Sequence, residues 1–337
     1  MSTVGNLALT MTDFRKRMTP DGQLDYIIEC LAESNPILED MKWMEGNLPT
    51  GIQTTQRTSI PTPSVRVINR GVAASKSTTE QITDTCMMLE DRSQIDVKLL
   101  QLQANKEAFR KSEDAAHMEG LAQKVARVSM YGDIKDDPDE FNGLSVRYKT
   151  FSGAKGDAGY QVIPAGTAGE KTNTSAFLVG WGERATAGIY PKNTQVGLKM
   201  TDLGESDVFD KDGRPFRAVQ TLFEWNCGLT VRDVRANALV RNINVATLAS
   251  LTSANKLALI EKFTKAKNRI RNLRQVGTKF SWYVSDSVYD FIECFLTDKN
   301  NVHVTRQEVM GQMPQLYLGG IKVQKLDCIK EDEEAIV

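Results

Sequence analysis

Residues 95–132 of the chain read IDVKLLQLQANKEAFRKSEDAAHMEGLAQKVARVSMYG and contain the strongest signal for regular structure. No proline interrupts the stretch from Ile95 to Met130, and Tyr131-Gly132 closes it in the manner of a helix C-cap. The pattern predicts one helix, which would extend about 54 Å at 1.5 Å per residue. A compact domain of this size has no need for so long a helix.

The apolar side chains of this stretch fall on two stripes, rotated by about 100° from each other. They are Ile95, Leu99, Leu102 and Phe109 in the first half, and Met118, Leu121, Val125 and Val128 in the second. Two stripes predict a spine helix that bridges two separate packing environments. Two consecutive helices with a break near Ser112 are the alternative.

The segment before the spine predicts an amphipathic arm. Thr19-Pro20-Asp21 is typical of a helix start, with proline in the first turn and an acid near the positive end of the dipole. One apolar stripe at spacing i, i+3, i+4, i+7 follows, formed by Leu24, Ile27, Ile28 and Leu31. Asn35-Pro36 ends this helix, and a short second helix follows. The stripe packs either on the chain's own core or on a neighbouring subunit.

Residues 47–95 have a different amino-acid composition, rich in Thr, Ser, Gln and Pro. Pro61 and Pro63 cannot donate to a β-ladder, so they suit a strand edge or a hairpin tip. We therefore predict a long, extended β-loop that projects from the body. Long loops without a core of their own are usually functional or disordered, and a disordered loop is the alternative.

Beyond Asp133 the pattern is α+β. Strands are predicted over 144–148, 160–163, 176–181, 195–200 and 218–225, helices over 255–274 and 286–296, and a Gly-Gly hairpin over 315–324. The expected fold class is therefore α+β.

Composition excludes several classes of function. The 337 residues carry 42 Lys+Arg against 43 Asp+Glu, and a net charge of −1 argues against a protein that coats nucleic acid. There is no run of 18 apolar residues and no secretory pattern at the N-terminus, so we expect a soluble intracellular protein without membrane association. Five isolated cysteines and two histidines, His117 and His303, lack metal-ligand spacing. The sequence thus predicts no catalytic residue, cofactor or metal, although a triad with remote partners stays open.

Two motifs that suggest ligand binding are better explained as loops. The glycine-rich stretch 153–159 leads into a strand, so no helix N-terminus follows to receive a phosphate. Asp207, Asp210 and Asp212 resemble a calcium loop, but Val208 occupies a ligand position and the pattern lacks the twelfth-position Glu. A turn between strands is the simpler interpretation.

A third motif is a basic helix. Residues 255–280 hold eight Lys/Arg and one Glu, and Lys262, Lys265 and Arg269 fall on one side. No aromatic side chains are interleaved for base stacking. We interpret the helix as a solvated face turned to an anionic surface, for which the acidic tail 331–334 is one candidate.

The order of arm, projecting loop, spine helix and α+β domain resembles the major capsid proteins of tailed bacteriophages, in particular short-tailed, podovirus-type phages. Local motifs carry the resemblance over about residues 24–329. They are Arg57–Pro61 with Arg66–Val72 in the loop, Val128–Gly132 with Phe141–Leu144 at the helix exit, and Ile189–Lys192, Gly197-Leu198, Asp202–Glu205 and Trp225–Asp233 further on.

This resemblance implies the HK-ninety-seven-like capsid fold and a division into named parts. These are an N-arm (1–46), an E-loop (47–94), a P-domain with the spine helix (95–140), an A-domain (about 141–300), and a return to the P-domain with a hairpin and acidic tail (301–337). The arm stripe and the loop residues Arg57, Pro61, Pro63 and Arg66 are then the expected assembly contacts.

The implied function is structural. The chain would form hexamers and pentamers that close into an icosahedral shell around double-stranded DNA, assembled in the bacterial cytoplasm and present in the virion. Scaffolding, portal and decoration proteins are the implied partners, and DNA is contacted only by non-specific proximity. An encapsulin-type compartment shell is one alternative. A cytosolic enzyme with an active site at a subunit interface is the other.

Overall fold

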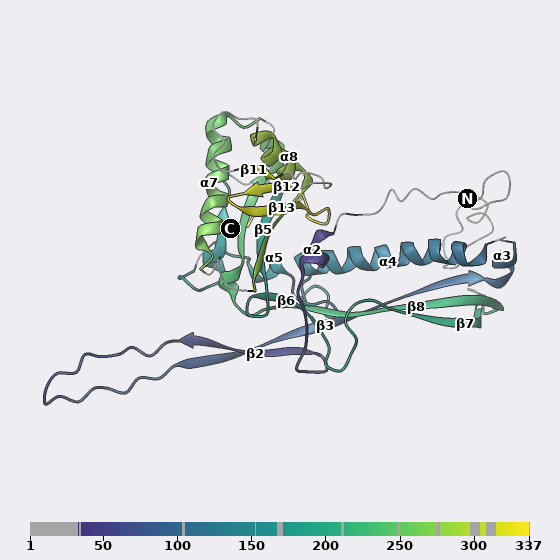
Figure 1. Cartoon of the computed structure of the whole chain (residues 1–337), viewed down its shortest axis with the longest axis horizontal. Coiled ribbons are helices and arrows are strands. Elements are labelled where there is room, and N and C mark those ends of the chain that lie inside the picture. Colours follow the sequence, from purple (N-terminus) through teal and green to yellow (C-terminus); the bar gives the residue numbers. More distant parts are fainter. Residues whose placement is uncertain are drawn as a thin grey trace.

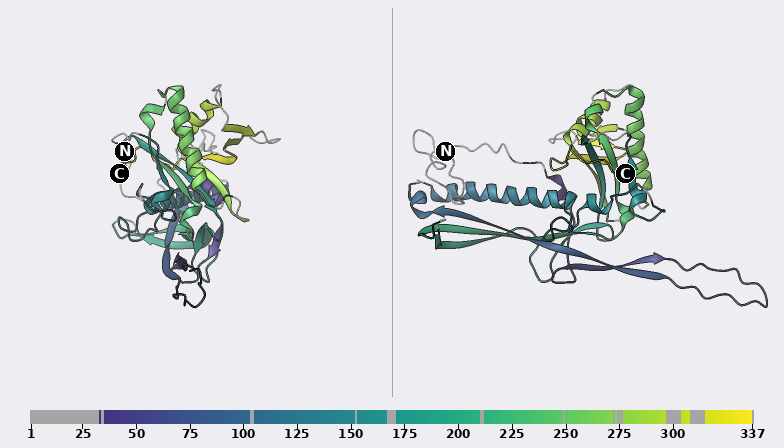
Figure 2. Two further views of the ribbon diagram at one scale, coloured as in Figure 1. Left: turned by 90° about the vertical axis from the view of Figure 1, so that its left-hand side faces the viewer. Right: turned by 180° about the vertical axis from the view of Figure 1, so that it is seen from behind.

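The structure is a computed structural model. It describes residues 33, 35–102, 105–151, 153–166, 171–209, 212–248, 250–271, 273, 277–296, 304–307 and 315–336. The described chain consists of an upright body and a long, flat extension (Figure 1; Figure 2). In the described residues no helix combines the length and the hydropathy needed to cross a membrane.

The helices are α2 Pro36–Asp40, α3 Val97–Gln101, α4 Lys106–Tyr131, α5 Leu144–Arg147, α6 Val245–Leu248, α7 Ser253–Arg269 and α8 Asp286–Phe295, with 3-10 turns η1 Gly159–Gln161 and η2 Val234–Ala236. The strands are β1 Trp43–Glu45, β2 Gly51–Ser59, β3 Thr78–Asp96, β4 Val162–Pro164, β5 Asn173–Trp181, β6 Thr186–Tyr190, β7 Lys199–Phe209, β8 Pro215–Val231, β9 Ala238–Asn244, β10 Lys279–Val284, β11 Val304–Gln307, β12 Gln315–Leu318 and β13 Ile321–Lys325.

One sheet runs through both parts in the order β11-β12-β13-β10-β5-β6-β8-β3-β2. Strand β3 pairs with β2 over its first half and with β8 over its second half. Strand β7 pairs with the outer half of β8, and α4 lies over this part of the sheet (Figure 1). From the body, α4 and the β2–β3 hairpin extend in opposite directions (Figure 2).

The body has a core on each face of its sheet, because successive strand residues point to opposite sides. Leu178 of β5 and Trp282 of β10 belong to the core that α7 and α8 cover. Their neighbours Phe177 and Tyr283 belong to the other core, which the end of α4 and α5 cover. The surface over the first core, on α7, is basic, whereas the turn 133–140 beside the second core is acidic.

The prediction of one helix from Ile95 is wrong. Strand β3 continues to Asp96 because it pairs with β8 as far as Ala218. The Asp96 side chain then caps α3 by accepting a hydrogen bond from the Lys98 amide at 2.8 Å. The Asn105 side chain caps α4 in the same way, by accepting from the Ala108 amide at 3.1 Å. The alternative break near Ser112 is also wrong, since α4 runs through it.

The two packing environments of the spine are confirmed. Phe109 lies with Ile95 in a small cluster near α3, whereas Val125 and Val128 lie in the core of the body. Helix α4 therefore joins the extension to the body. Two members of the predicted stripes are exposed instead, Leu102 and Met118.

Other predicted elements are confirmed or corrected. Strands β5 and β8, helices α7 and α8, and the β12–β13 hairpin lie where the sequence predicts them, and Gly319 and Gly320 take φ of 58° and 82° in its turn. Residues 144–148 form α5 and its C-cap Tyr148, not a strand, and the adjacent residues Leu144 and Ser145 are both buried, which does not fit the alternation of a strand with one buried face. The strand predicted at 195–200 starts at Lys199 instead.

A buried ion pair fixes the C-terminal tail to the body. Arg241 on β9 donates to a Glu333 carboxylate oxygen at 3.4 Å, and both side chains are nearly inaccessible. Arg241 also donates to the Ser145 carbonyl at 3.0 Å, and Tyr131 donates to Glu333 at 2.6 Å. The pair thus joins the tail to the ends of α4 and α5.

Replacing Glu333 with Ala should strongly destabilise the body, because Arg241 is left buried without its counter-charge. We expect a loss of about 3–5 kcal/mol in the free energy of unfolding, measured by urea denaturation. The matched control is Glu334→Ala, whose side chain is 81% exposed and pairs with Lys171 at 3.7 Å. This control should change stability by no more than about 0.5 kcal/mol, and equal losses in both variants would contradict the assignment.

Candidate assembly surfaces

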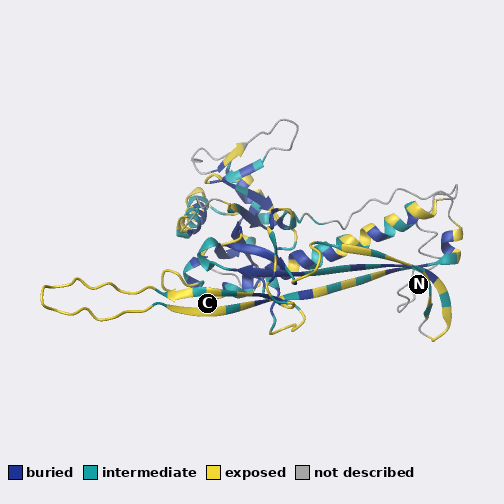
Figure 3. Cartoon of the chain, turned by 60° about the horizontal axis from the view of Figure 1, so that its bottom comes forward, coloured by how far each residue is buried: buried dark blue, intermediate teal, exposed yellow. Residues whose placement is uncertain are grey.

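The β2–β3 hairpin is the most exposed part of the described chain. Its strands pair from Gly51 opposite Thr85 to Ser59 opposite Thr78, with a bulge after Arg57. Residues 60–77 continue beyond the ladder as an extended loop that lies in solvent (Figure 3). Strand β2 ends the strand order of the described sheet, so its outer edge is open. An open edge is a template for pairing with another chain.

The loop presents apolar and basic side chains to water. Its exposed apolar residues, with 48% to 93% of their surface accessible, are Ile60, Val65, Val67, Ile68 and Val72. Residues 58–79 contain Arg66, Arg70 and Lys76 but no Asp or Glu. Clustered apolar side chains on a monomer surface mark an interaction site. The loop is therefore suited to an apolar surface with an anionic border.

The structure brings together four of the eight residues that the sequence predicts as assembly contacts. Arg57 lies on β2, and Pro61, Pro63 and Arg66 lie in the loop beyond it, all four exposed. The other four lie outside the described residues: Leu24, Ile27, Ile28 and Leu31.

A buried carboxylate anchors the root of the hairpin. Asp84 on β3 accepts from Arg147 of α5 at 2.8 Å and from the Thr230 hydroxyl of β8 at 2.7 Å. Gln56 on β2 donates to the Arg232 carbonyl at 2.7 Å. The projecting strands are thus tied to α5 and β8. Sequence reasoning missed Asp84, because β3 also contains other acids, such as Glu80 and Glu90, and nothing in the sequence sets Asp84 apart from them.

Replacing Asp84 with Asn should loosen this root, because Arg147 loses its charged acceptor. We expect a loss of about 1–3 kcal/mol in stability and faster hydrogen exchange in β2 and the first half of β3. Glu80→Gln is the matched control, since Glu80 is an exposed acid on the same strand. Unchanged exchange in the Asp84 variant would show that the anchor has no role in holding the hairpin.

The segment that leads out of the N-terminal arm is anchored as well. Asp40, at the end of α2, accepts from the hydroxyls of Ser281 at 3.0 Å and Tyr283 at 2.8 Å, and it pairs with Lys279. Burial alone would raise the pKa of the Asp40 carboxyl, but these partners outweigh burial and lower it below its ordinary value. The charged form of Asp40 therefore stabilises the fold.

This lowered pKa predicts a pH dependence. As the pH is lowered from about 5 to about 2, Asp40 takes up a proton in the unfolded chain before it does so in the folded chain. The stabilisation by charged Asp40 is therefore fully present above its ordinary pKa of about 3.9, and it is lost as the pH decreases below that value. The Asp40→Asn variant should lose less stability over this range than the unmodified chain. Urea titrations at each pH measure the difference. Glu39→Gln changes an exposed neighbour and should keep the original slope.

The middle of α4 contacts the sheet through polar groups. His117 Nδ1 lies 2.6 Å from Asp91 Oδ2 on β3, and its ring stacks on Phe223 at 5.7 Å between centroids. Arg110 pairs with Asp202 of β7 at 3.1 Å and lowers the pKa of that carboxyl by hydrogen bonding. His117 is thus part of a helix–sheet contact, and His303 lies outside the described residues.

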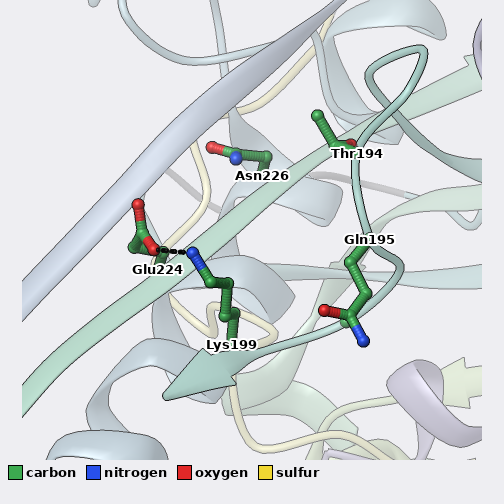
Figure 4. A pocket seen from close by; sticks show the side chains of 6 residues that line it. Thr194, Gln195, Lys199, Glu224 and Asn226 are labelled. Atoms are coloured by element: carbon green, nitrogen blue, oxygen red, sulfur yellow. Dashed lines mark hydrogen bonds and ion pairs between the residues drawn. The ribbon is translucent and has the colours of Figure 1, made fainter. Parts of the chain in front are cut away.

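One pocket of the described chain and two of its thiols bear on possible chemistry. A pocket of about 280 Å³ lies beside β8 and contains the Lys199–Glu224 pair at 2.8 Å (Figure 4). It is lined by Thr194, Gln195, Gly197, Lys199, Glu224 and Asn226. Burial raises the pKa of the Cys86 and Cys328 thiols to about 12, which disfavours the nucleophilic thiolate. No group of His, Cys, Asp and Glu within the described chain is placed to hold a metal ion.

A projecting hairpin with an open edge, an exposed apolar loop and firmly anchored roots defines a structural subunit that other chains complete. Comparison of the sequence with known families gives the particular class. Residues 19–337 match the family described as Major capsid protein GP7, and the chain belongs to this family. No curated protein matches it.

Solved structures give the same fold. The chain is similar to a protein in the near-atomic cryo-EM structure of bacteriophage Epsilon15, with 29% identity, a TM-score of 0.77, and coverage of 100% of this chain and 99% of that one. A weaker likeness is to the bacteriophage JBD30 capsid, with 10% identity, a TM-score of 0.49, and coverage of 92% of this chain and 99% of that one. Another is to the holo-SrpI encapsulin complex of Synechococcus elongatus PCC 7942, with 11% identity, a TM-score of 0.43, and coverage of 71% of this chain and 97% of that one. No conclusion rests on these two.

These findings confirm the main predictions from the sequence. The chain has the α+β, HK-ninety-seven-like capsid fold, and it is a structural protein of a phage virion that assembles into a shell. The family is not an enzyme family, so the interface-enzyme alternative is set aside. The encapsulin alternative is the weaker one, because the matched family is that of phage major capsid proteins.

Proposed function

We propose that this chain forms hexamers and pentamers that close into an icosahedral shell around double-stranded DNA. The observation that carries the proposal is the β2–β3 hairpin, whose acid-free, apolar loop 60–77 stands in solvent far from its own core. A neighbouring subunit is the partner that covers it. Assembly takes place in the bacterial cytoplasm, with a scaffolding protein inside, a portal at one vertex and decoration proteins outside.

The physical argument is that an extended subunit is stable only when neighbours cover its open surfaces. An interface of standard size buries about 1,200–2,000 Å². Many such contacts act together in a closed shell, so each of them needs only modest affinity. Packaged DNA brings its own counterions, so a net charge of −1 is compatible with non-specific proximity to DNA.

We assign the parts of the capsid fold to the described elements. The E-loop (47–94) comprises β2, the loop 60–77 and most of β3, and the body corresponds to the A-domain. Strand β7 and the outer half of β8 lie under α4, although the boundary 141–300 placed them in the A-domain. We therefore propose that the P-domain includes them, together with α4 and the end of β3.

The loop contact is tested by Arg66→Glu in the full chain. Assembly should weaken because a trans contact loses its cation, whereas the free energy of unfolding should change by no more than about 0.5 kcal/mol. Ile28→Asp tests the arm stripe in the same way. The readouts are electron microscopy and sedimentation of the expressed chain, alone and with a scaffolding protein, and Arg92→Glu on β3 is the charge-matched control.

Hollow, roughly spherical particles from the unmodified chain, and fewer of them from the variants, are the expected outcome. A uniform species of a few subunits under both conditions would refute the proposed shell. Variants that unfold yet still build normal shells would refute the assignment of these residues to assembly.

A further inference from the structure

The exposed face of α7 carries positive charge that the described chain does not neutralise. The Arg269 guanidinium lies 4.7 Å from the centre of the Tyr160 ring and donates to the Val162 carbonyl at 3.0 Å. Both groups are uncharged, so they hold the guanidinium without cancelling its charge. Among the described residues no carboxylate forms an ion pair with Lys262 or Lys265. The three cations fall on one side of the helix, next to its buried face, with Lys265 exposed and Lys262 and Arg269 half-buried.

The acidic tail does not cover this face, so that candidate for the anionic surface is wrong. Glu333 is buried against Arg241, whose guanidinium binds Ser145 of α5 on the face of the sheet opposite α7. Glu334 pairs with Lys171, and Glu331 accepts from the Ser287 amide at the start of α8 at 3.0 Å. Three of the four tail carboxylates therefore have partners away from the basic face of α7.

The turn that follows α4 has the opposite character. Residues 133–140 hold five carboxylates and one lysine. Asp133 pairs with Lys149 at 2.8 Å and Glu140 pairs with Lys124, so the ends of the turn are neutralised. The carboxylates between them are exposed and make no ion pair with any described cation; they are Asp136, Asp137 and Asp139. The turn therefore carries negative charge without ion-pair partners, and the α7 face carries positive charge without them.

These two surfaces lie on opposite faces of the same sheet. Helix α7 covers one face, where Phe263 contacts Trp282 with ring centroids 5.1 Å apart. The acidic turn leads into Phe141 and Leu144, which are buried in the core of the other face. The two surfaces cannot meet within one chain, and they can meet when copies associate head to tail. A repeated head-to-tail contact closes into a ring when the rotation permits.

We propose that the basic face of α7, formed by Lys262, Lys265 and Arg269, docks on the acidic turn 133–140 of the next copy around a capsomer. This inference rests on the proposed shell function and names one of its lateral contacts. A protein partner is favoured over nucleic acid because Glu261 interrupts the basic face and no aromatic platform accompanies it.

The experiment is a charge exchange in the full-length chain. Lys262→Glu with Lys265→Glu, and separately Asp136→Lys with Asp137→Lys, should each raise the chain concentration for half-maximal assembly by about tenfold or more. All four substitutions together should bring it back to within about threefold of the unmodified chain. The defects should shrink in 1 M salt, where the Debye length falls to about 3 Å. Lys106→Glu with Lys111→Glu, on exposed positions of α4, is the matched control.

Three outcomes would overturn the inference. The four-substitution chain could assemble as poorly as either parent, which would show that the two surfaces do not meet. The α7 variant could assemble normally, which would show that its cations are not in an assembly contact. The α7 variant could form normal shells that retain less DNA, which would assign the basic face to nucleic acid instead.

A second measurement separates this inference from the proposed function. Lys265→Cys combined with Asp136→Cys should yield disulfide-linked ladders of copies under mild oxidation, and neither single variant should do so. Shells that form without these ladders would leave the shell function intact and overturn the α7 contact. Discrete small oligomers without ladders would refute both.

Discussion

Strand β3 exchanges one hydrogen-bonding partner for another at its middle, and the shape of the subunit depends on this exchange. Up to Thr85 it pairs with β2, and from Cys86 onward it pairs with β8. One continuous strand therefore belongs to the projecting hairpin at one end and to the sheet under α4 at the other. The buried Asp84 lies at the exchange point, bound to Arg147 and Thr230. The hairpin and the sheet under α4 thus share one continuous strand, with no loop between them.

Helix α4, which lies over the sheet, also joins the extension to the body. Its ends are held by apolar clusters around Phe109 and Val125, whereas its middle rests on polar contacts such as His117 with Asp91. Burial raises the pKa of the nearby Asp114 carboxyl, and the charges of Arg110 and His117 oppose this shift. Apolar packing at the ends fixes the position of α4, and directional polar contacts in the middle fix its rotation.

Periodicity in the sequence was enough for the elements that bury one clear face, such as α7 and α8, and for the projecting loop, whose prolines exclude a central strand. It failed at Ile95, because an apolar residue at the end of a long strand also fits a helical stripe. It could not find Arg241 with Glu333, which are 92 positions apart, or Asp84 with Arg147. A lone charge in a strand-like segment does not identify its distant partner. The family resemblance supplied the architecture that these contacts stabilise.

The Arg241–Glu333 pair has a consequence for protein quality control in an infected cell. A chain that ends between residues 326 and 332 keeps Arg241 in a site built to bury it, but without its counter-charge. The body of such a fragment is destabilised even though every strand of the described sheet is present. Fragments of this kind would be exposed to proteases instead of being incorporated. The ion pair therefore makes the stability of a subunit depend on the presence of its C-terminal tail.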